Sequence, residues 1–344
     1  MKLFRRIIVW GLLSVIIQFS GLLYVNNYLL STNTDGITSK KVDIPTKQEE
    51  KNIDVVIPAT AKHVSVSYDG GYTAYYEGEI LHIINNKTGQ NKEVNFKDGN
   101  KISFYKWLPD RNRMLITEKS QSKVTDNLKL SYYDVDKGEK VEVKDLATVD
   151  SKSEVEDIKL STLTNVIYVK VAHSGNRSSI YRINIMNEMK KIETKGYLIG
   201  SIDVIPHEDK MVYEDLTYNK IYATNTTEPL NFKNVTKPVL LGIDDDDRIY
   251  VGQMEGNKVI KIYYGLMKDA TSNWKNVELK EAVDKEDIYI SSEGKVYIND
   301  DLKGVITDIT SSNTLTYQGR FLQMYEGGVA TISQGKLIRT NFKK

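Results

Sequence analysis

Histidines and carboxylates are the residue types in this 344-residue chain that could most readily do chemistry. The four histidines, His63, His82, His173 and His207, are scattered, and no two stand at a spacing typical of metal ligands. A turn or strand position explains each of them better than a role as ligand or general base. The chain has no cysteine, so it offers no disulfide, thiolate metal site or thiol nucleophile.

A hydrolase could use a serine nucleophile or a pair of carboxylates. A serine hydrolase needs a Gly-x-Ser-x-Gly turn, and the nearest text, Ala172-His-Ser-Gly-Asn176, lacks the first glycine. A glycosidase needs two carboxylates about 5 to 10 Å apart, a separation that sequence does not provide. We therefore predict a protein that is not an enzyme, with no catalytic residue. A carboxylate-dependent glycan-active enzyme is the alternative.

The run from Asp244 to Asp247 is the densest group of acids in the chain. Calcium prefers several carboxylate oxygens, but the run lacks the spaced ligands and distal glutamate of an EF-hand loop. It also stands between two apolar stretches, where acids are ordinary turn residues. We predict a turn there, no metal site and no cofactor, with calcium as the alternative.

Tyrosine is abundant, and four of its positions could form a contact with a sugar or a protein, namely Tyr72, Tyr75, Tyr263 and Tyr264. Adjacent residues on a strand point to opposite faces, so half of these tyrosines are expected in the core. A glycan therefore remains a possible partner.

The elements that position these residues are predicted from a repeat. Val, Ile, Thr and Tyr fill the apolar positions, which is typical of β-strands. Short strands meet an acidic or Asn turn and restart at seven places, centred on Asp69, Asp110, Asn165, Asp209, Asp247, Glu293 and Glu326. The mean spacing is about 43 residues, the period of four-stranded propeller blades.

The repeat predicts an all-β fold, a β-propeller of seven four-stranded blades over residues 52–344. Six blades is the alternative, because Glu293 and Glu326 lie closer together than the mean period. The last repeat has room for three strands only, whereas a strand over 52–58 precedes the first repeat. We expect this strand to complete the last blade as its outer strand, since an open ring would leave sheet edges unpaired.

One repeat also carries a family resemblance. The sequence Trp107-Leu-Pro-Asp110, followed by the strand Arg113–Thr117, resembles the Trp-Ser-Pro-Asp-Gly-Lys repeats of TolB-like and dipeptidyl-peptidase-IV-type β-propellers. Arg111 and Asn112 stand where that family has Gly-Lys, and the other repeats keep little beyond the acidic turn. The resemblance implies a binding or assembly platform, because such propellers carry either a fused hydrolase or a protein partner.

The N-terminal residues predict a membrane anchor. Residues 7–25 contain no charged side chain and are close to the length that crosses a bilayer core. Lys2, Arg5 and Arg6 precede them, which places the N-terminus in the cytoplasm. We predict a cytoplasmic tail (1–6), a transmembrane signal anchor (7–25), a flexible stalk (26–51) and an extracytoplasmic propeller (52–344). A cleaved signal peptide is the alternative.

The charge of the predicted external part argues against nucleic acid as a partner. Without Lys2, Arg5 and Arg6, the 47 Lys and Arg fall slightly below the 46 Asp and Glu. Together these features predict a membrane-anchored, non-catalytic module of the bacterial cell envelope that binds or assembles another envelope or membrane protein. A sensor or regulator that binds a small ligand or a glycan is the alternative.

Overall fold

The computed structural model describes residues 2–25, 54–94, 96, 99–120 and 125–342. The chain divides into two units, Met1–Glu50 and Lys51–Lys344, and each is described by itself.

The first unit contains one helix, α1 (Lys2–Tyr24), in its described residues. The apolar side chains described in it are exposed, among them Trp10, Ile17 and Phe19. Among the described residues, no helix combines the length and the apolar character that crossing a membrane requires. The predicted anchor over 7–25 therefore stays a prediction. The predicted stalk over 26–51 lies outside the described residues.

The second unit is a seven-bladed β-propeller, as predicted, and the six-blade alternative is wrong. Blade 1 consists of β1 (Lys62–Val66), β2 (Tyr72–Glu77), β3 (Ile80–Asn85) and β4 (Asn91–Val94). Blade 2 consists of β5 (Lys101–Trp107), β6 (Arg113–Lys119), β7 (Thr125–Asp134) and β8 (Glu139–Asp150). Blade 3 consists of β9 (Glu154–Ser161), β10 (Val166–His173), β11 (Arg177–Ile183) and β12 (Met189–Ile192).

Blade 4 consists of β13 (Ile199–Val204), β14 (Met211–Asp215) and β15 (Lys220–Ala223). Blade 5 consists of β16 (Pro238–Ile243), β17 (Arg248–Glu255), β18 (Lys258–Leu266) and β19 (Lys275–Asp284). Blade 6 consists of β20 (Ile288–Ile290), β21 (Val296–Asp300), β22 (Val305–Asp308) and β23 (Thr314–Thr316). Blade 7 consists of β24 (Arg320–Tyr325), β25 (Gly328–Ser333) and β26 (Lys336–Asn341). The 3₁₀ helices η2 (Thr271–Asn273) and η3 (Lys285–Asp287) flank β19.

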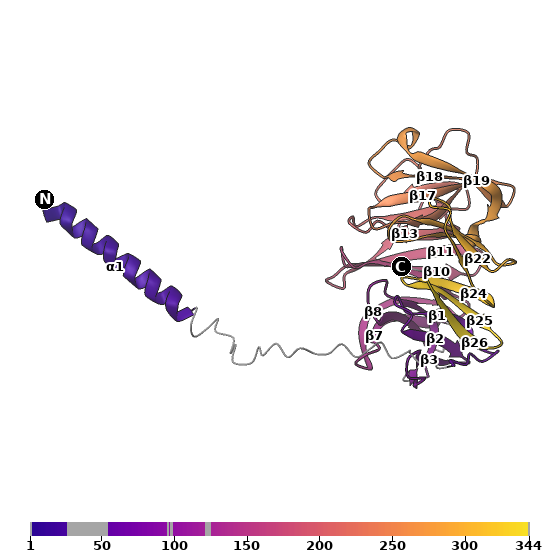
Figure 1. The fold of residues 1–344 in the computed structure, drawn as a ribbon, viewed down its shortest axis with the longest axis horizontal. Helices are drawn as coiled ribbons and strands as arrows, with labels where there is room; N and C mark the ends of the chain where they lie inside the picture. The colour runs from indigo at the N-terminus through magenta and orange to yellow at the C-terminus, as the bar shows by residue number, and fades with distance from the viewer. Residues whose placement is uncertain (1, 26–53, 95, 97–98, 121–124, 343–344) are drawn as a thin grey trace. The chain divides into compact units, whose positions relative to one another are not determined.

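All seven predicted turns connect the first and second strands of their blades. The first strands of neighbouring blades contact one another, as β5 does with β9 and β13 with β16. The blades follow one another in chain order, and β1 of the first blade contacts β24 of the last (Figure 1). The first strands therefore surround a central channel, and the seven turns lie at one end of it.

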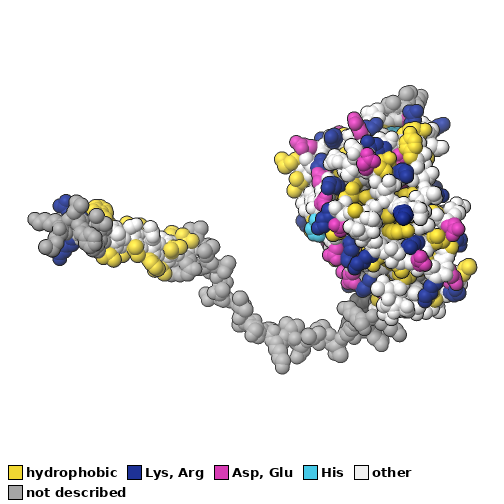
Figure 2. Space-filling view, turned by 90° about the horizontal axis from the view of Figure 1, so that it is seen from above, with side chains coloured by type: hydrophobic (Ala, Val, Ile, Leu, Met, Phe, Trp, Pro, Cys, Tyr) yellow, Lys and Arg dark blue, Asp and Glu magenta, His cyan; other side chains and the backbone are white. Residues whose placement is uncertain are grey.

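Apolar side chains between neighbouring blades form the core. Ala74 and Leu81 of blade 1, for example, pack with Tyr105, Met114 and Ile116 of blade 2, and all five are fully buried. Burying a large apolar side chain in this way contributes roughly 1.5 to 3 kcal/mol. A single sheet cannot bury both of its faces, so the radial stack is what stabilises each blade. On the visible outer face, basic and acidic side chains are interspersed (Figure 2).

The segment before β1 closes the ring, as predicted. Val56 pairs antiparallel with Lys336 at the outer edge of β26. Two backbone hydrogen bonds flank this pair, from Ile57 N–H to Gly335 O (2.8 Å) and from Leu337 N–H to Val55 O (2.9 Å). The side chains of Val55 and Ile57 are buried in a cluster that includes residues of blade 1. This segment therefore links the last blade to the first.

Candidate functional site

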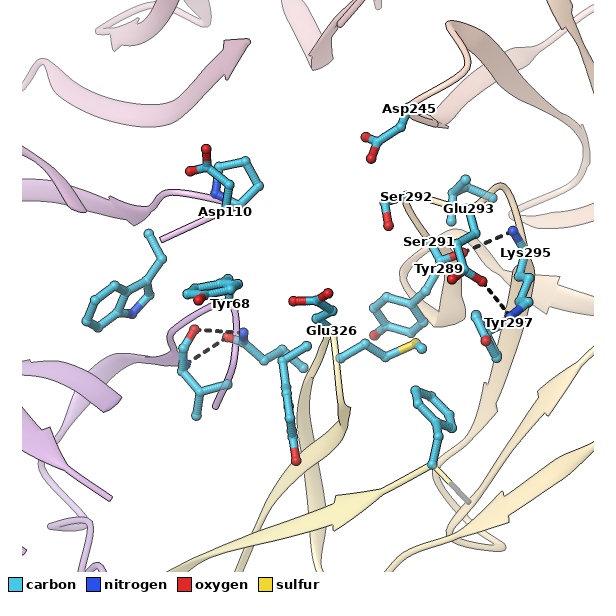
Figure 3. A pocket seen from close by; sticks show the side chains of 18 of the residues that line it. Tyr68, Asp110, Asp245, Tyr289, Ser291, Ser292, Glu293, Lys295, Tyr297 and Glu326 are labelled. Atoms are coloured by element: carbon cyan, nitrogen blue, oxygen red, sulfur yellow. Dashed lines mark hydrogen bonds and ion pairs between the residues drawn. The ribbon is translucent and has the colours of Figure 1, made fainter. Parts of the chain in front are cut away.

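A wide cavity lies at the end of the channel where the seven turns meet. Its volume is about 2270 Å³, and residues from all seven blades line it. We call it the axial cavity (Figure 3). Because its wall is assembled from turns far apart in the sequence, only closure of the ring creates it.

Carboxylates from several turns face the axial cavity. Asp110 of blade 2, Asp245 of blade 5 and Glu326 of blade 7 lie around the same open space (Figure 3). Glu293 of blade 6 also lines it, together with Asp246. The sequence motif thus supplies three of these acids, at the turns of blades 2, 6 and 7.

Some of these carboxylates have a cationic neighbour on their own turn, and others do not. The pairs are Asp110 with Arg111 (2.6 Å), Asp246 with Arg248 (2.5 Å) and Glu293 with Lys295 (2.5 Å). The carboxylates of Asp245 and Glu326 have no hydrogen-bond or ion-pair partner among the described residues. These two are therefore the acids available to a ligand.

Asp245 is also electrostatically unusual. Partial burial, reinforced by the charges of Asp244 and Asp246, raises the pKa of its carboxyl above the ordinary value of 3.8. The ionised carboxylate is therefore less stable than it would be in water, and a nearby cation would stabilise it.

Aromatic side chains complete the wall. Tyr68, Tyr289 and Tyr325 are half-buried and line the cavity. Trp107 lines it as well, is only 8% exposed, and its Nε1–H has no hydrogen-bond acceptor among the described residues. A buried donor without an acceptor costs free energy.

Charged side chains of both signs occupy the channel wall. Lys159 of β9 lies 3.4 Å from Asp203 of β13. Burial lowers the pKa of Lys159, but the charges of Asp203 and Asp157 outweigh it and raise the pKa overall. Burial and then the charge of Lys159 lower the pKa of Lys106, which lines the axial cavity. The two lysines and the two aspartates of this part of the channel therefore balance in charge.

Other acids of the predicted turns are structural. Asp69 accepts hydrogen bonds from Ser67 Oγ (2.7 Å) and from Gly71 N–H (2.8 Å), which hold the turn of blade 1. Asp209 accepts hydrogen bonds from Tyr168 Oη (3.0 Å) and Arg182 Nε (2.8 Å), both on blade 3. The same sequence signal therefore marks turn-forming acids in some blades and cavity acids in others.

The run from Asp244 to Asp247 forms a turn, as predicted. Asp244 is fully buried, and its carboxylate accepts hydrogen bonds from Tyr250 Oη (2.9 Å) and Arg248 Nε (2.7 Å). Asp247 has a positive φ of 64° and accepts a hydrogen bond from His207 N–H (3.0 Å). Across the described residues, no group of three or more His, Cys, Asp or Glu could hold a metal ion. The calcium alternative therefore finds no ligand cluster in this run.

The histidines lie apart from one another. His82 stacks on Tyr75 at 5.0 Å, and His173 Nδ1 lies 2.8 Å from Ser153 Oγ. His63 and His207 line the axial cavity from blades 1 and 4.

The tyrosines chosen from sequence are not those of the cavity. Tyr75 is buried, whereas Tyr72, Tyr263 and Tyr264 are half-buried, and none of the four lines the axial cavity. Tyr68, Tyr289 and Tyr325 do line it; Tyr68 follows β1, Tyr289 lies within β20 and Tyr325 ends β24.

The fold is shared with known propeller structures, while the sequence matches neither a family model nor a curated protein. A prolyl endopeptidase structure matches with a TM-score of 0.52 and 13% identity, covering 84% of this chain and 50% of that chain. A chain of the mitotic checkpoint complex matches with a TM-score of 0.50 and 12% identity, covering 89% of this chain and 99% of that chain.

Dipeptidyl peptidase 4 of Porphyromonas gingivalis matches with a TM-score of 0.47 and 12% identity, covering 79% of this chain and 48% of that chain. The chain thus spans about half the length of the peptidase chains that it matches. At these identities the likeness shows the propeller fold and nothing of the activity.

Proposed function

We propose that this protein is a non-catalytic β-propeller that binds or assembles another protein through its axial cavity. The observation that carries the proposal is the convergence of all seven blades on one wide cavity, which presents beside tyrosines two carboxylates without a partner among the described residues. Tyrosine is enriched at protein interfaces, and loops on a rigid scaffold are common binding sites. A propeller chain of the mitotic checkpoint complex provides an analogy for such a role.

The location we propose is the bacterial cell envelope, with the propeller outside the membrane and another envelope or membrane protein as partner. The support is the uncharged stretch over 7–25 behind Lys2, Arg5 and Arg6. Membrane fractionation, followed by protease treatment of intact cells, tests it. Recovery of the full-length chain in the soluble fraction would overturn the location without touching the binding proposal.

Photo-crosslinking inside cells tests the binding proposal. A photoreactive phenylalanine analogue replaces either Tyr68, in the axial cavity, or Tyr197, which is 60% exposed on the link between blades 3 and 4 and outside the cavity. We expect one reproducible protein adduct from position 68 and none from position 197. Equal adducts from both positions, or none from position 68, would contradict the proposal.

A second candidate is a carboxylate-dependent glycan-active enzyme. It is favoured by one observation: Asp245 and Glu326 line the same cavity, neither has a partner in the described part of the chain, and the pKa of Asp245 is raised, as a general acid requires. Purified full-length protein is assayed for release of reducing ends from cell-wall glycans. Release that Asp245→Asn abolishes, but that the exposed control Glu255→Gln retains, would establish this candidate over the first.

A further inference from the structure

We propose that the axial cavity binds a cationic polypeptide segment, a loop or tail that places Lys or Arg side chains beside Asp245 and Glu326. The inference rests on the proposed protein-binding function and names the chemistry of the partner.

The charge of the cavity wall favours a cation. Two lysines line the cavity, Lys106 and Lys295, against six carboxylates, those of Asp110, Asp245, Asp246, Glu293, Asp308 and Glu326. Cations on the same turns already neutralise Asp110, Asp246 and Glu293. Of the other three, Asp308 accepts hydrogen bonds from Thr310 N–H and Ser311 Oγ, whereas Asp245 and Glu326 have no partner among the described residues.

The state of Asp245 supports the same conclusion. Its pKa is raised by partial burial and by the neighbouring charges of Asp244 and Asp246. A lysine or arginine of a partner would offset the repulsion and donate hydrogen bonds to the carboxylate. His207 of the protein offsets part of this effect, and a cation in the cavity would stabilise the ionised form of Asp245 further.

The size and the other wall groups indicate a polypeptide and not a small cation. A volume of about 2270 Å³ exceeds the roughly 300 to 1,000 Å³ of ordinary small-molecule pockets. Tyr68 and Tyr289 add aromatic surface on which a guanidinium or ammonium group can rest. The buried Nε1–H of Trp107 has no acceptor among the described residues, and a peptide carbonyl is the kind of group that would supply one.

The test uses the full-length protein and a fluorescein-labelled peptide of six Lys-Gly repeats, with a Glu-Gly peptide of the same length as control. Fluorescence anisotropy is measured for the wild type, for the double variant Asp245→Asn/Glu326→Gln, and for Glu255→Gln. Glu255 is an exposed acid at the end of β17 and outside the axial cavity. Thermal melting monitors the fold of each variant.

We expect the Lys-Gly peptide to bind, and the double variant to weaken its binding about tenfold, while Glu255→Gln changes it less than about twofold. Raising the salt concentration should weaken wild-type binding as well. Equal affinity of the folded double variant and the wild type would overturn the inference. So would equal affinity for the Glu-Gly peptide, or displacement by spermine alone at the peptide's own concentration.

Crosslinking from position 68 in the double variant separates this inference from the proposed function. If the wild type yields the adduct and the double variant loses it, both are supported. An adduct that persists in the double variant would leave the protein-binding function intact and overturn the cationic partner. The absence of any adduct in the wild type would overturn the function itself.

Discussion

The side-chain amide of Gln323 exchanges two hydrogen bonds with the peptide groups of Val66, and so joins the last blade to the first. Val66 N–H donates to Gln323 Oε1 (3.2 Å), and Gln323 Nε2 donates to Val66 O (3.1 Å). β1 is the first strand of its blade, so this edge has no neighbouring strand. The amide takes the place of a strand there.

We therefore expect Gln323→Leu to lower the free energy of unfolding by about 1 to 3 kcal/mol, because two peptide groups lose their partners. Gln323→Glu keeps the acceptor and loses the donor, so it should also destabilise the protein. Urea unfolding followed by circular dichroism measures both. A change below about 0.5 kcal/mol in Gln323→Leu would show that water replaces the amide at no cost.

Lys119 provides a second link, between blades 2 and 3. Its side chain is fully buried, and its Nζ donates to Ser151 O (2.8 Å), Ser153 O (2.6 Å) and Glu154 Oε1 (2.9 Å). Lys119→Met should lower the free energy of unfolding by about 3 to 5 kcal/mol, because it leaves buried acceptors unpaired. Lys137→Met, at an exposed turn, is the control and should change it by less than about 0.5 kcal/mol.

Ring closure can be tested on three adjacent residues. Val55 and Ile57 are 4% and 5% exposed, whereas Val56 between them is 61% exposed. Val55→Ala and Ile57→Ala should each lower the free energy of unfolding by about 1 to 4 kcal/mol, and Val56→Ala by less than about 0.5 kcal/mol. Thermal unfolding of the three variants measures the difference. Equal effects would mean that the segment is not packed against the last blade.

The pair of Asp209 and Arg182 predicts a pH dependence. Hydrogen bonds from Arg182 lower the pKa of the Asp209 carboxyl below 3.8, against the opposing effect of burial. A lowered pKa in the folded state contributes stability above the unfolded value, and this stability is lost as the pH falls through the folded value. The wild type should therefore exceed Asp209→Asn in stability at pH 6, and the difference should shrink below pH 4.

Urea unfolding of both proteins between pH 3 and pH 6 checks this dependence. Arg182→Met should remove most of the pH-dependent difference, because Arg182 is the main cause of the shift. A difference between wild type and Asp209→Asn that stays constant over this range would show that the carboxylate charge does not contribute.

Sequence alone favoured seven blades, with six as the alternative that the structure ruled out, and predicted the way in which the ring closes. The turn signal recurs in every blade, and each copy reports a local event, a chain reversal between two strands, which depends on a few adjacent residues. The strand before the first repeat was predicted to complete the last blade because an edge must be paired, and Val56 does pair with Lys336.

Only the tertiary structure decided which residues form the axial cavity. Asp209 and Glu326 occupy the same position in the repeat, yet Asp209 accepts hydrogen bonds from blade 3, while Glu326 faces the cavity with no partner among the residues that the structure describes. Strand alternation likewise predicts that adjacent Tyr side chains point to opposite faces of a sheet, but it does not predict which of them reach the channel. The reason is physical: the cavity wall comes from seven separate turns, so a side chain's surroundings depend on how neighbouring blades stack, which local sequence does not encode.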